Sequence, residues 1–307
     1  MKDFRSEKRD VGVNFSIAPD SPCPCGCGKA ASECCLTNYE LYKAPACTTP
    51  LPPKSGDHIR KCYASRLADC STTLSREHYI SASLLHYIDQ FKNLTVSGLP
   101  WLNGKEKVLP PNALASKILC ERHNSALSPL DGMAVHLFRA FDEEGIAGSG
   151  QQLLYLFSGH DLERWLLKML CGIASSGSLP TDNDCDFSIP RMWLNVLFGH
   201  AEFTRGRGLY VCVDKDHQFA GPHGLELRAI TGEGKLTGIG LFVCGYELIL
   251  SMTGFPARRF NKRKVAYRPM EFHATGKNCE KSVVFSWDGE ADRGTIHTGM
   301  GRPWTPP

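Results

Sequence analysis

A run of apolar residues with helical spacing marks residues 160–174. Hydrophobic side chains recur there at every third or fourth position, and they are Leu162, Trp165, Leu166, Met169, Leu170 and Ile173. Glu163, Arg164 and Lys168 occupy the other face, so the pattern predicts an amphipathic helix. A shorter helix is predicted over residues 190–199, because proline fits the first turn of a helix and glycine is typical just past its end.

After Gly206 the pattern changes to short apolar stretches, several of which are separated by glycine-rich turns. Stretches of this kind predict β-strands. They cover residues 209–214, 225–231, 235–243, 246–252, 270–275 and 282–287. The back half of the chain is therefore expected to be an α+β domain with a mainly antiparallel sheet.

Composition narrows the class of protein. The 307 residues are 42% hydrophobic and 22% charged, which is enough apolar material to bury a core. Thirty-five basic against 32 acidic side chains leave a charge of +3, too balanced to identify a polyanion-binding protein. No stretch approaches the roughly 18 apolar residues that span a bilayer, and the charged start of the chain does not resemble a signal peptide. We expect a soluble, cytoplasmic protein without a membrane partner.

Fourteen cysteines change this picture, and most of them lie at or before Cys120. A secreted disulfide scaffold is normally shorter and has a signal peptide, whereas clustered cysteines in a reducing compartment more often bind metal. We therefore expect the front half to be held by zinc. The later cysteines lack ligand spacing and are expected to pack as small hydrophobic residues.

The first cysteine cluster has the spacing C-x-C, eight residues, then C-C. The thiolates of Cys23, Cys25, Cys34 and Cys35 can close a tetrahedral zinc site of the structural type. A segment of about 16 residues cannot build a hydrophobic core, so zinc would supply its folding free energy.

This segment resembles the SEC-C zinc motif, which occurs at the tail of the SecA translocation ATPase and in many bacterial proteins. The resemblance covers the C-P-C-G-x-G-K opening and the eight-residue gap. It implies docking to a protein or nucleic-acid partner. Cys27 stands where the family usually has serine, which adds a fifth thiol and leaves open which four bind the ion.

A second set consists of two pairs, Cys62-x7-Cys70 and Cys120-x-x-His123. These pairs suit a treble-clef zinc site, in which a hairpin and the start of a helix share one metal. The seven-residue gap is wider than the common C-x-x-C, so Cys47 or His58 stands as an alternative ligand. The helix is predicted from Asn124, with these apolar residues on its core face: Leu127, Leu130, Met133, Leu137, Phe138 and Phe141.

Glu77-His78-Tyr-Ile and then Asn112 lie between the two pairs, and His123-Asn124 ends the second pair. In this order the three pieces resemble the first motif, the middle Asn and the last motif of the HNH nucleases, also called ββα-metal or His-Me finger nucleases. The resemblance covers roughly residues 60–142 and implies one catalytic Mg²⁺ or Mn²⁺ beside about two structural Zn²⁺ ions.

Phosphodiester hydrolysis explains these residue types. The resemblance assigns His78 as the general base that takes a proton from water. Glu77 and Asn124 would supply hard oxygens to the divalent ion. Asn112 is expected to hydrogen-bond across the loop and fix the backbone of His78.

A basic segment lies in the back half, with no acidic residue among its positive charges. It contains Arg258, Arg259, Lys262, Arg263, Lys264 and Arg268. Such a run would neutralise phosphates and give salt-dependent, sequence-independent affinity for DNA. The alternative is a solvated loop between strands.

These observations predict a flexible tail at residues 1–20, a zinc knot with a Pro-rich connector at 21–53, an HNH-like nuclease domain at 54–145 and a C-terminal recognition or control domain at 146–307. The predicted activity is divalent-metal-dependent cleavage of DNA, in anti-phage defence or restriction, and a double-strand cutter would favour a homodimer. The alternatives are a non-catalytic zinc-binding adaptor and an RNA-directed nuclease on the same site.

Overall fold

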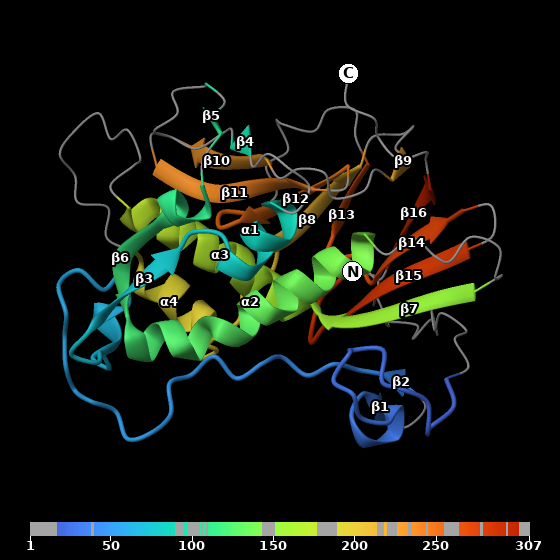
Figure 1. The fold of residues 1–307 in the computed structure, drawn as a ribbon, viewed down its shortest axis with the longest axis horizontal. Coiled ribbons are helices and arrows are strands. Elements are labelled where there is room, and N and C mark those ends of the chain that lie inside the picture. The colour runs from blue at the N-terminus through green and yellow to red at the C-terminus, as the bar shows by residue number, and fades with distance from the viewer. Residues whose placement is uncertain are drawn as a thin grey trace, which may run out of the picture.

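The computed structural model describes fifteen stretches of the chain. They are residues 17–37, 40–89, 95–96, 105, 107–108, 110–142, 151–176, 189–213, 218–219, 226–232, 235–243, 245–254, 264–276, 279–292 and 294–300. Within them the fold is mixed α+β, with mainly antiparallel sheets and a compact cysteine cluster near the N-terminus, as predicted (Figure 1). No described helix is long and apolar enough to cross a membrane.

The N-terminal cysteine cluster, which we define as Cys23 to Cys35, docks on the body of the protein. It is followed by strands β1 (Leu36–Thr37) and β2 (Glu40–Leu41) and lies below β7 (Gln151–Ser158) in Figure 1. The backbone N–H of Leu156 donates to the carbonyl of Pro24 over 3.0 Å. Gly26 has φ 73°, and a Cβ there would come within 2.7 Å of His136 on helix α2 (Glu121–Asp142). Glycine is thus required where the cluster meets the body.

A ββα arrangement occupies the next part of the chain. Strands β3 (Leu74–His78) and β6 (Ala115–Cys120) pair antiparallel, and helix α2 (Glu121–Asp142) follows β6 directly. Between the strands lie α1 (Ala82–Asp89), β4 (Thr95–Val96) and β5 (Lys107–Val108). The helix predicted from Asn124 begins three residues earlier, at Glu121, so that His123 lies in its first turn.

Two five-stranded sheets form the rest of the fold. In the first, the order is β10 (Glu226–Gly232), β11 (Lys235–Val243), β12 (Tyr246–Ser251), β8 (Gly208–Val213) and β13 (Lys264–Tyr267), and all pairs are antiparallel. In the second, the order is β7, β15 (Cys279–Ser286), β14 (Glu271–Thr275), β16 (Thr295–Met300) and β9 (Gln218–Phe219). The second sheet is mixed, because β7 pairs parallel with β15, and β16 pairs parallel with β14 and β9.

Helix α3 (Gly159–Ser175) lies at the centre of the protein and is buried from Gly159 to Ala174. It packs against α2, α4 (Arg191–Leu197), β7, β11 and β12. The amphipathic helix predicted here is confirmed in position, but its polar face is not exposed to solvent. Glu163, Arg164 and Lys168 are all buried.

The buried charges of α3 each have a partner elsewhere in the chain. Glu163 accepts hydrogen bonds from Arg268 Nε at 2.8 Å and Arg268 Nη2 at 3.0 Å, and from the backbone N–H of Leu209 at 2.8 Å. Asp161 accepts from the backbone N–H of Ala46 at 3.0 Å. These contacts join the helix to both the Pro-rich connector and the first sheet.

The Glu163–Arg268 pair gives the first testable prediction. Replacing Arg268 by Met leaves the Glu163 carboxylate buried without its main partner, so Arg268→Met should lower the free energy of unfolding by about 3–5 kcal/mol. Arg205 pairs with Glu290 at 2.9 Å with its side chain 86% exposed, so Arg205→Met should cost less than about 1 kcal/mol. Denaturant unfolding of both variants checks this, and similar small losses in the two would contradict it.

Candidate metal centres and active-site cavity

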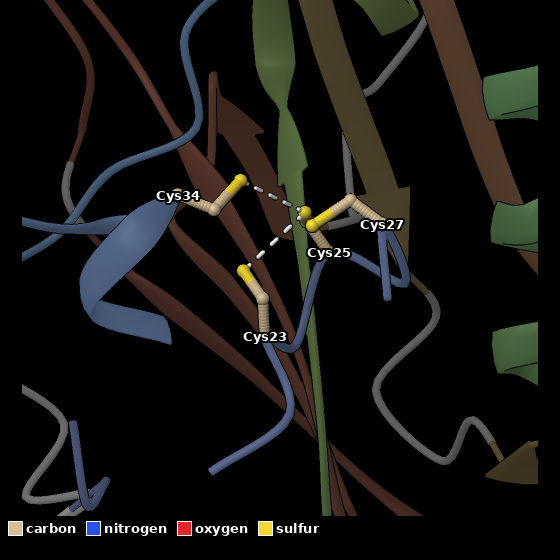
Figure 2. A group of neighbouring side chains, drawn as sticks. All are labelled: Cys23, Cys25, Cys27 and Cys34. Atoms are coloured by element: carbon tan, nitrogen blue, oxygen red, sulfur yellow. Dashed lines mark hydrogen bonds between the residues drawn. The ribbon is translucent and has the colours of Figure 1, made fainter. Parts of the chain in front are cut away.

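The N-terminal cluster brings five thiols together. The sulfurs of Cys23, Cys25, Cys27 and Cys34 all lie within 4.8 Å of one another, and Figure 2 shows their side chains converging. Cys23 Sγ is 3.4 Å from Cys25 Sγ, Cys25 Sγ is 3.6 Å from Cys34 Sγ, and Cys34 Sγ is 3.4 Å from that of Cys35. Zn–S bonds of about 2.3 Å place the sulfurs of a tetrahedral site about 3.8 Å apart. The cluster therefore can hold zinc. Cys27 belongs to the group of four thiols within reach of one another, whereas Cys35, which was predicted as a ligand, does not.

Charge in this cluster is concentrated on Cys25. Burial raises the pKa of its thiol, but hydrogen bonds from Cys23 and Cys27 outweigh burial and lower the pKa to about 6. The pKa of the Lys43 ammonium is raised, because the negative charge of Cys25 and its neighbours outweighs the effect of burial. The thiolate is the form that binds metal, so the surroundings of Cys25 favour its ligand state at neutral pH, whereas burial raises the pKa of Cys34 and Cys35.

The second cluster consists of the predicted residues Cys62, Cys70, Cys120 and His123, all buried. The Nδ1 of His123 lies 3.6 Å, 4.0 Å and 3.1 Å from the sulfurs of Cys62, Cys70 and Cys120. Within the seven-residue gap, the 3-10 turn Ser65–Leu67 ends at Ala68, which has φ 54°, and this turn returns the chain so that both cysteines face one centre. The grouping of these four residues is as predicted, and this cluster too can hold zinc.

The alternative ligands lie outside this cluster. Cys47 is exposed and its thiol lies 3.9 Å from the carbonyl of Thr49. The Nδ1 of His58 is 2.8 Å from the carbonyl of Ser65.

His123 is prepared to act as a neutral ligand. Burial lowers the pKa of its imidazole to about 4, with a smaller lowering contribution from Arg122. Its ring meets Phe198 edge-on at 5.0 Å, and its Nε2 has no hydrogen-bond partner among the described residues. A neutral imidazole with Nδ1 facing three thiols is the arrangement that a Cys3His zinc site requires.

A cavity of about 320 Å³ opens beside this second cluster. Its walls include Glu77, His78 and Asn124, three of the four predicted catalytic residues, together with Arg76, Asp131 and Lys168. The end of β3 supplies Glu77 and His78, and the first turn of α2 supplies Asn124 next to His123. The cluster thus holds the end of β6 beside the helix start that supplies Asn124 to the cavity.

Asn112, the fourth predicted residue, lies in the 3-10 turn Pro111–Leu114 just before β6. Its side chain hydrogen-bonds to His78, and its carbonyl accepts from Arg76 Nη2 at 3.2 Å. The prediction had Asn112 fixing the backbone of His78, whereas this contact reaches the imidazole itself. Asn112 therefore orients the ring.

The electrostatics of the cavity separate the roles of its side chains. Burial lowers the pKa of His78, and Arg76 lowers it further, so the imidazole is neutral at pH 7. Burial raises the pKa of Glu77, and the ammonium of Lys168, 2.7 Å from Oε1, acts against that rise. A neutral imidazole can accept a proton, and a carboxylate can bind a hard cation.

Lys168 was missed as a site residue in the sequence because it belongs to a distant helix. Its Nζ lies 2.7 Å from Glu77 and 2.6 Å from Asp131. The carboxylates of Glu77 and Asp131 outweigh burial and raise the pKa of Lys168, so the ammonium stays charged. The only hint in the sequence is that Lys168 shares the polar face of the predicted helix with Glu163 and Arg164. A solvent-exposed polar face would give the same pattern, so the sequence does not identify Lys168 as a site residue.

The predicted basic segment is only partly described. Arg258, Arg259, Lys262 and Arg263 lie outside the described residues, and Lys264 begins β13. Arg268 is 3% exposed and holds Glu163, so its guanidinium is not available to a phosphate. A group of three polar residues, His160, Glu202 and Asp288, also comes together, but the Nε2 of His160 already accepts from the backbone N–H of Asp288 at 3.0 Å.

Among known proteins, no family model, curated protein or solved structure matches this chain.

The two cysteine clusters predict zinc content. The purified chain should contain about two zinc ions, and Cys70→Ser should contain about one, because a Cys3His site loses a ligand that the fold cannot replace. Cys47→Ser, an exposed cysteine outside both clusters, is the matched control and should keep both ions. Elemental analysis of the dialysed proteins makes the measurement.

One zinc ion or none in the wild-type chain would contradict this division of the cysteines. Removing Cys27 and Cys35 one at a time identifies the thiol that the first ion does not need.

Proposed function

We propose that this chain is a divalent-metal-dependent endonuclease of the HNH type that hydrolyses DNA phosphodiester bonds. The observation that carries the proposal is the shared cavity of Glu77, His78 and Asn124 beside the Cys3His cluster. The ββα order of β3, β6 and α2 supports it, as do the resemblance of the E-H, Asn and H-N motifs and the neutral state of His78.

The reaction is assigned to this chain's residues as follows. His78 takes a proton from the attacking water, and the hydrogen bond that its ring donates to Asn112 orients the imidazole for that transfer. Glu77 and Asn124 offer oxygens that fit a hard divalent cation. When bound, Mg²⁺ or Mn²⁺ would supply Lewis-acid stabilisation of the phosphate and of the leaving oxygen. Arg76, exposed at the cavity, would contact the phosphate backbone.

The remaining features take supporting roles. Zinc in the N-terminal cluster would hold a segment that is too small for a core of its own. Zinc in the second cluster would hold the first turn of α2 beside the end of β6. The N-terminal cluster, which resembles the SEC-C motif, would present Cys27 and its neighbours to a protein or nucleic-acid partner. Anti-phage defence or restriction is the biological setting that we propose for a nuclease joined to a recognition domain. A double-strand cutter with one site per chain would act as a homodimer.

The rival function is a zinc-binding adaptor without catalysis. Its supporting observation is that Lys168 engages Glu77 in an ion pair, which a structural role would also explain. RNA is the alternative substrate, because a ββα site that grips the phosphate backbone does not choose the sugar.

Cleavage of supercoiled plasmid separates these functions. The wild-type chain should nick or linearise plasmid with Mg²⁺ or Mn²⁺ and not with EDTA. His78→Ala should lower the rate by about 10²–10⁴-fold, which is the usual contribution of a general base. The control is His200→Ala, an exposed histidine away from the cavity, which should cut at the wild-type rate.

Zinc content must be equal in the three proteins. Equal cleavage by wild type and His78→Ala would place the active site elsewhere. Cleavage of a transcript and not of plasmid would select the RNA alternative, and no cleavage of either would favour the adaptor.

The pKa of His78 predicts the pH dependence of cleavage. A general base works only when neutral, so the rate falls as pH drops through the pKa of His78 and is level above it. Burial and Arg76 lower that pKa, so the fall should come at a lower pH than a histidine base with the usual pKa would give. Arg76→Gln should move the fall to higher pH, whereas the exposed Arg60→Gln should not. A single-turnover rate profile tests this, and an Arg76→Gln profile that superimposes on the wild type would refute the assignment.

A further inference from the structure

We propose that the ammonium of Lys168 occupies the cation position on Glu77 until a divalent ion displaces it, and that Asp131 holds the displaced ammonium. Lys168 and Asp131 are thereby part of the metal site, although neither belongs to the motifs that define it. This inference rests on the metal site of the proposed function.

The geometry places three charges in one wall of the cavity. Lys168 Nζ lies 2.7 Å from Glu77 Oε1 and 2.6 Å from Asp131 Oδ2. Lys168 is 3% exposed and Glu77 is 4% exposed, so water screens their attraction little. An ammonium ion at hydrogen-bond distance from a carboxylate oxygen stands where a divalent cation would stand on the same atom.

Two cations cannot share this place. A divalent ion and an ammonium repel each other at contact distance, and each satisfies the same buried carboxylate. Glu77 must therefore exchange one for the other. The ion pair between Lys168 and Glu77 therefore opposes metal binding.

Asp131 is built to keep Lys168 during this exchange. It contacts Nζ through both oxygens, at 2.6 and 2.8 Å, whereas Glu77 contacts it through Oε1. Ser81 Oγ donates to Asp131 Oδ1, and Trp165 Nε1 donates to Ser81 Oγ at 2.9 Å. Asp131 is also the less buried carboxylate, with 26% of its side chain exposed. Lys168 therefore stays paired with Asp131 when it leaves Glu77, so its buried charge is not left unpaired.

The test measures Mn²⁺ binding to the full, zinc-loaded chain without substrate, by electron paramagnetic resonance at constant pH. Lys168→Gln removes the competing charge and keeps a hydrogen-bond donor for the carboxylates, so Mn²⁺ should bind about tenfold more tightly or better. Glu77→Gln should abolish binding. Lys281 is an equally buried lysine, and its Nζ donates to the carbonyl of Phe141, so Lys281→Gln should bind Mn²⁺ as the wild type does.

Unchanged or weaker Mn²⁺ binding in Lys168→Gln would overturn the competition. If that variant does not fold, Lys168→Arg gives the opposite test. Its guanidinium keeps the charge and can grip a carboxylate through two donors, so Mn²⁺ should bind no more tightly than to the wild type. Tighter binding to Lys168→Arg would also overturn the proposal.

A double-mutant cycle tests the role of Asp131. Asp131→Asn should weaken Mn²⁺ binding in the wild type, because the displaced ammonium loses its anion. In the Lys168→Gln background the same change should have little effect, since no ammonium needs a partner. Equal weakening in both backgrounds would mean that Asp131 attracts the ion directly, and the anchoring role would be wrong.

The outcomes distinguish this inference from the nuclease proposal. Mn²⁺ binding that responds to Lys168 without any cleavage refutes the nuclease and supports the exchange. If the chain cleaves its substrate and Lys168→Gln binds Mn²⁺ with the wild-type affinity, the nuclease is supported and the exchange is refuted. Absence of Mn²⁺ binding in every variant refutes both.

Discussion

The burial of α3 around its whole circumference is the constraint on which the rest of the structure depends. Its four charged side chains, Asp161, Glu163, Arg164 and Lys168, are all buried, and an unpaired buried charge is strongly destabilising. Each therefore requires a partner from a different part of the chain. The connector, the first sheet and the ββα arrangement all reach the helix for this reason. The charged side chains of α3, which would face solvent on an isolated helix, here determine which distant segments pack against it.

The two cysteine clusters act in different surroundings. The N-terminal cluster organises a short segment with little apolar area to bury, whereas the cysteines of the Cys3His cluster lie in the main hydrophobic core. The Cys3His cluster ties the end of β6 to the first turn of α2 through Cys120 and His123. The β3–β6 ladder then places Glu77 and His78 opposite Ser116 and Ala115. The cavity walls thus come from the end of β3, the start of α1, α2 and α3, and each element sets the position of a different side chain.

Local spacing is what made part of this site predictable. Cys120 and His123 lie three residues apart, and the E-H pair is contiguous, so the grouping of these residues follows from short-range geometry. Cys62 and Cys70 were recovered despite an unusual gap because a 3-10 turn shortens it. Strand β7 was not predicted, since its parallel partner β15 lies more than a hundred residues later and no local pattern reports such a pairing.

Lys168 could not be placed from the sequence for the same reason. A lysine on the polar side of a helical pattern predicts solvent, and only the packing of α2 and both sheets around α3 reverses that expectation. Arg268 was misplaced in the prediction for a similar reason. Arg268 follows a basic run, which favoured a phosphate contact. Its guanidinium instead pairs with the carboxylate of Glu163, whose position is set by the burial of α3. In both cases the deciding partner is an acid far away in the chain.

This arrangement connects the cavity to the C-terminal sheets through one helix. Glu163 and Lys168 are five residues apart on α3, about 7.5 Å along its axis. Glu163 is held by Arg268 and by the backbone of β8, whereas Lys168 is held by Glu77 and Asp131. A ligand on the sheets would alter the cavity only if it bound more tightly to one position of α3 relative to α2 than to another. Because a helix moves as a unit, such a shift would change the distance between Lys168 and Glu77, and with it the ease with which a divalent cation takes the carboxylate.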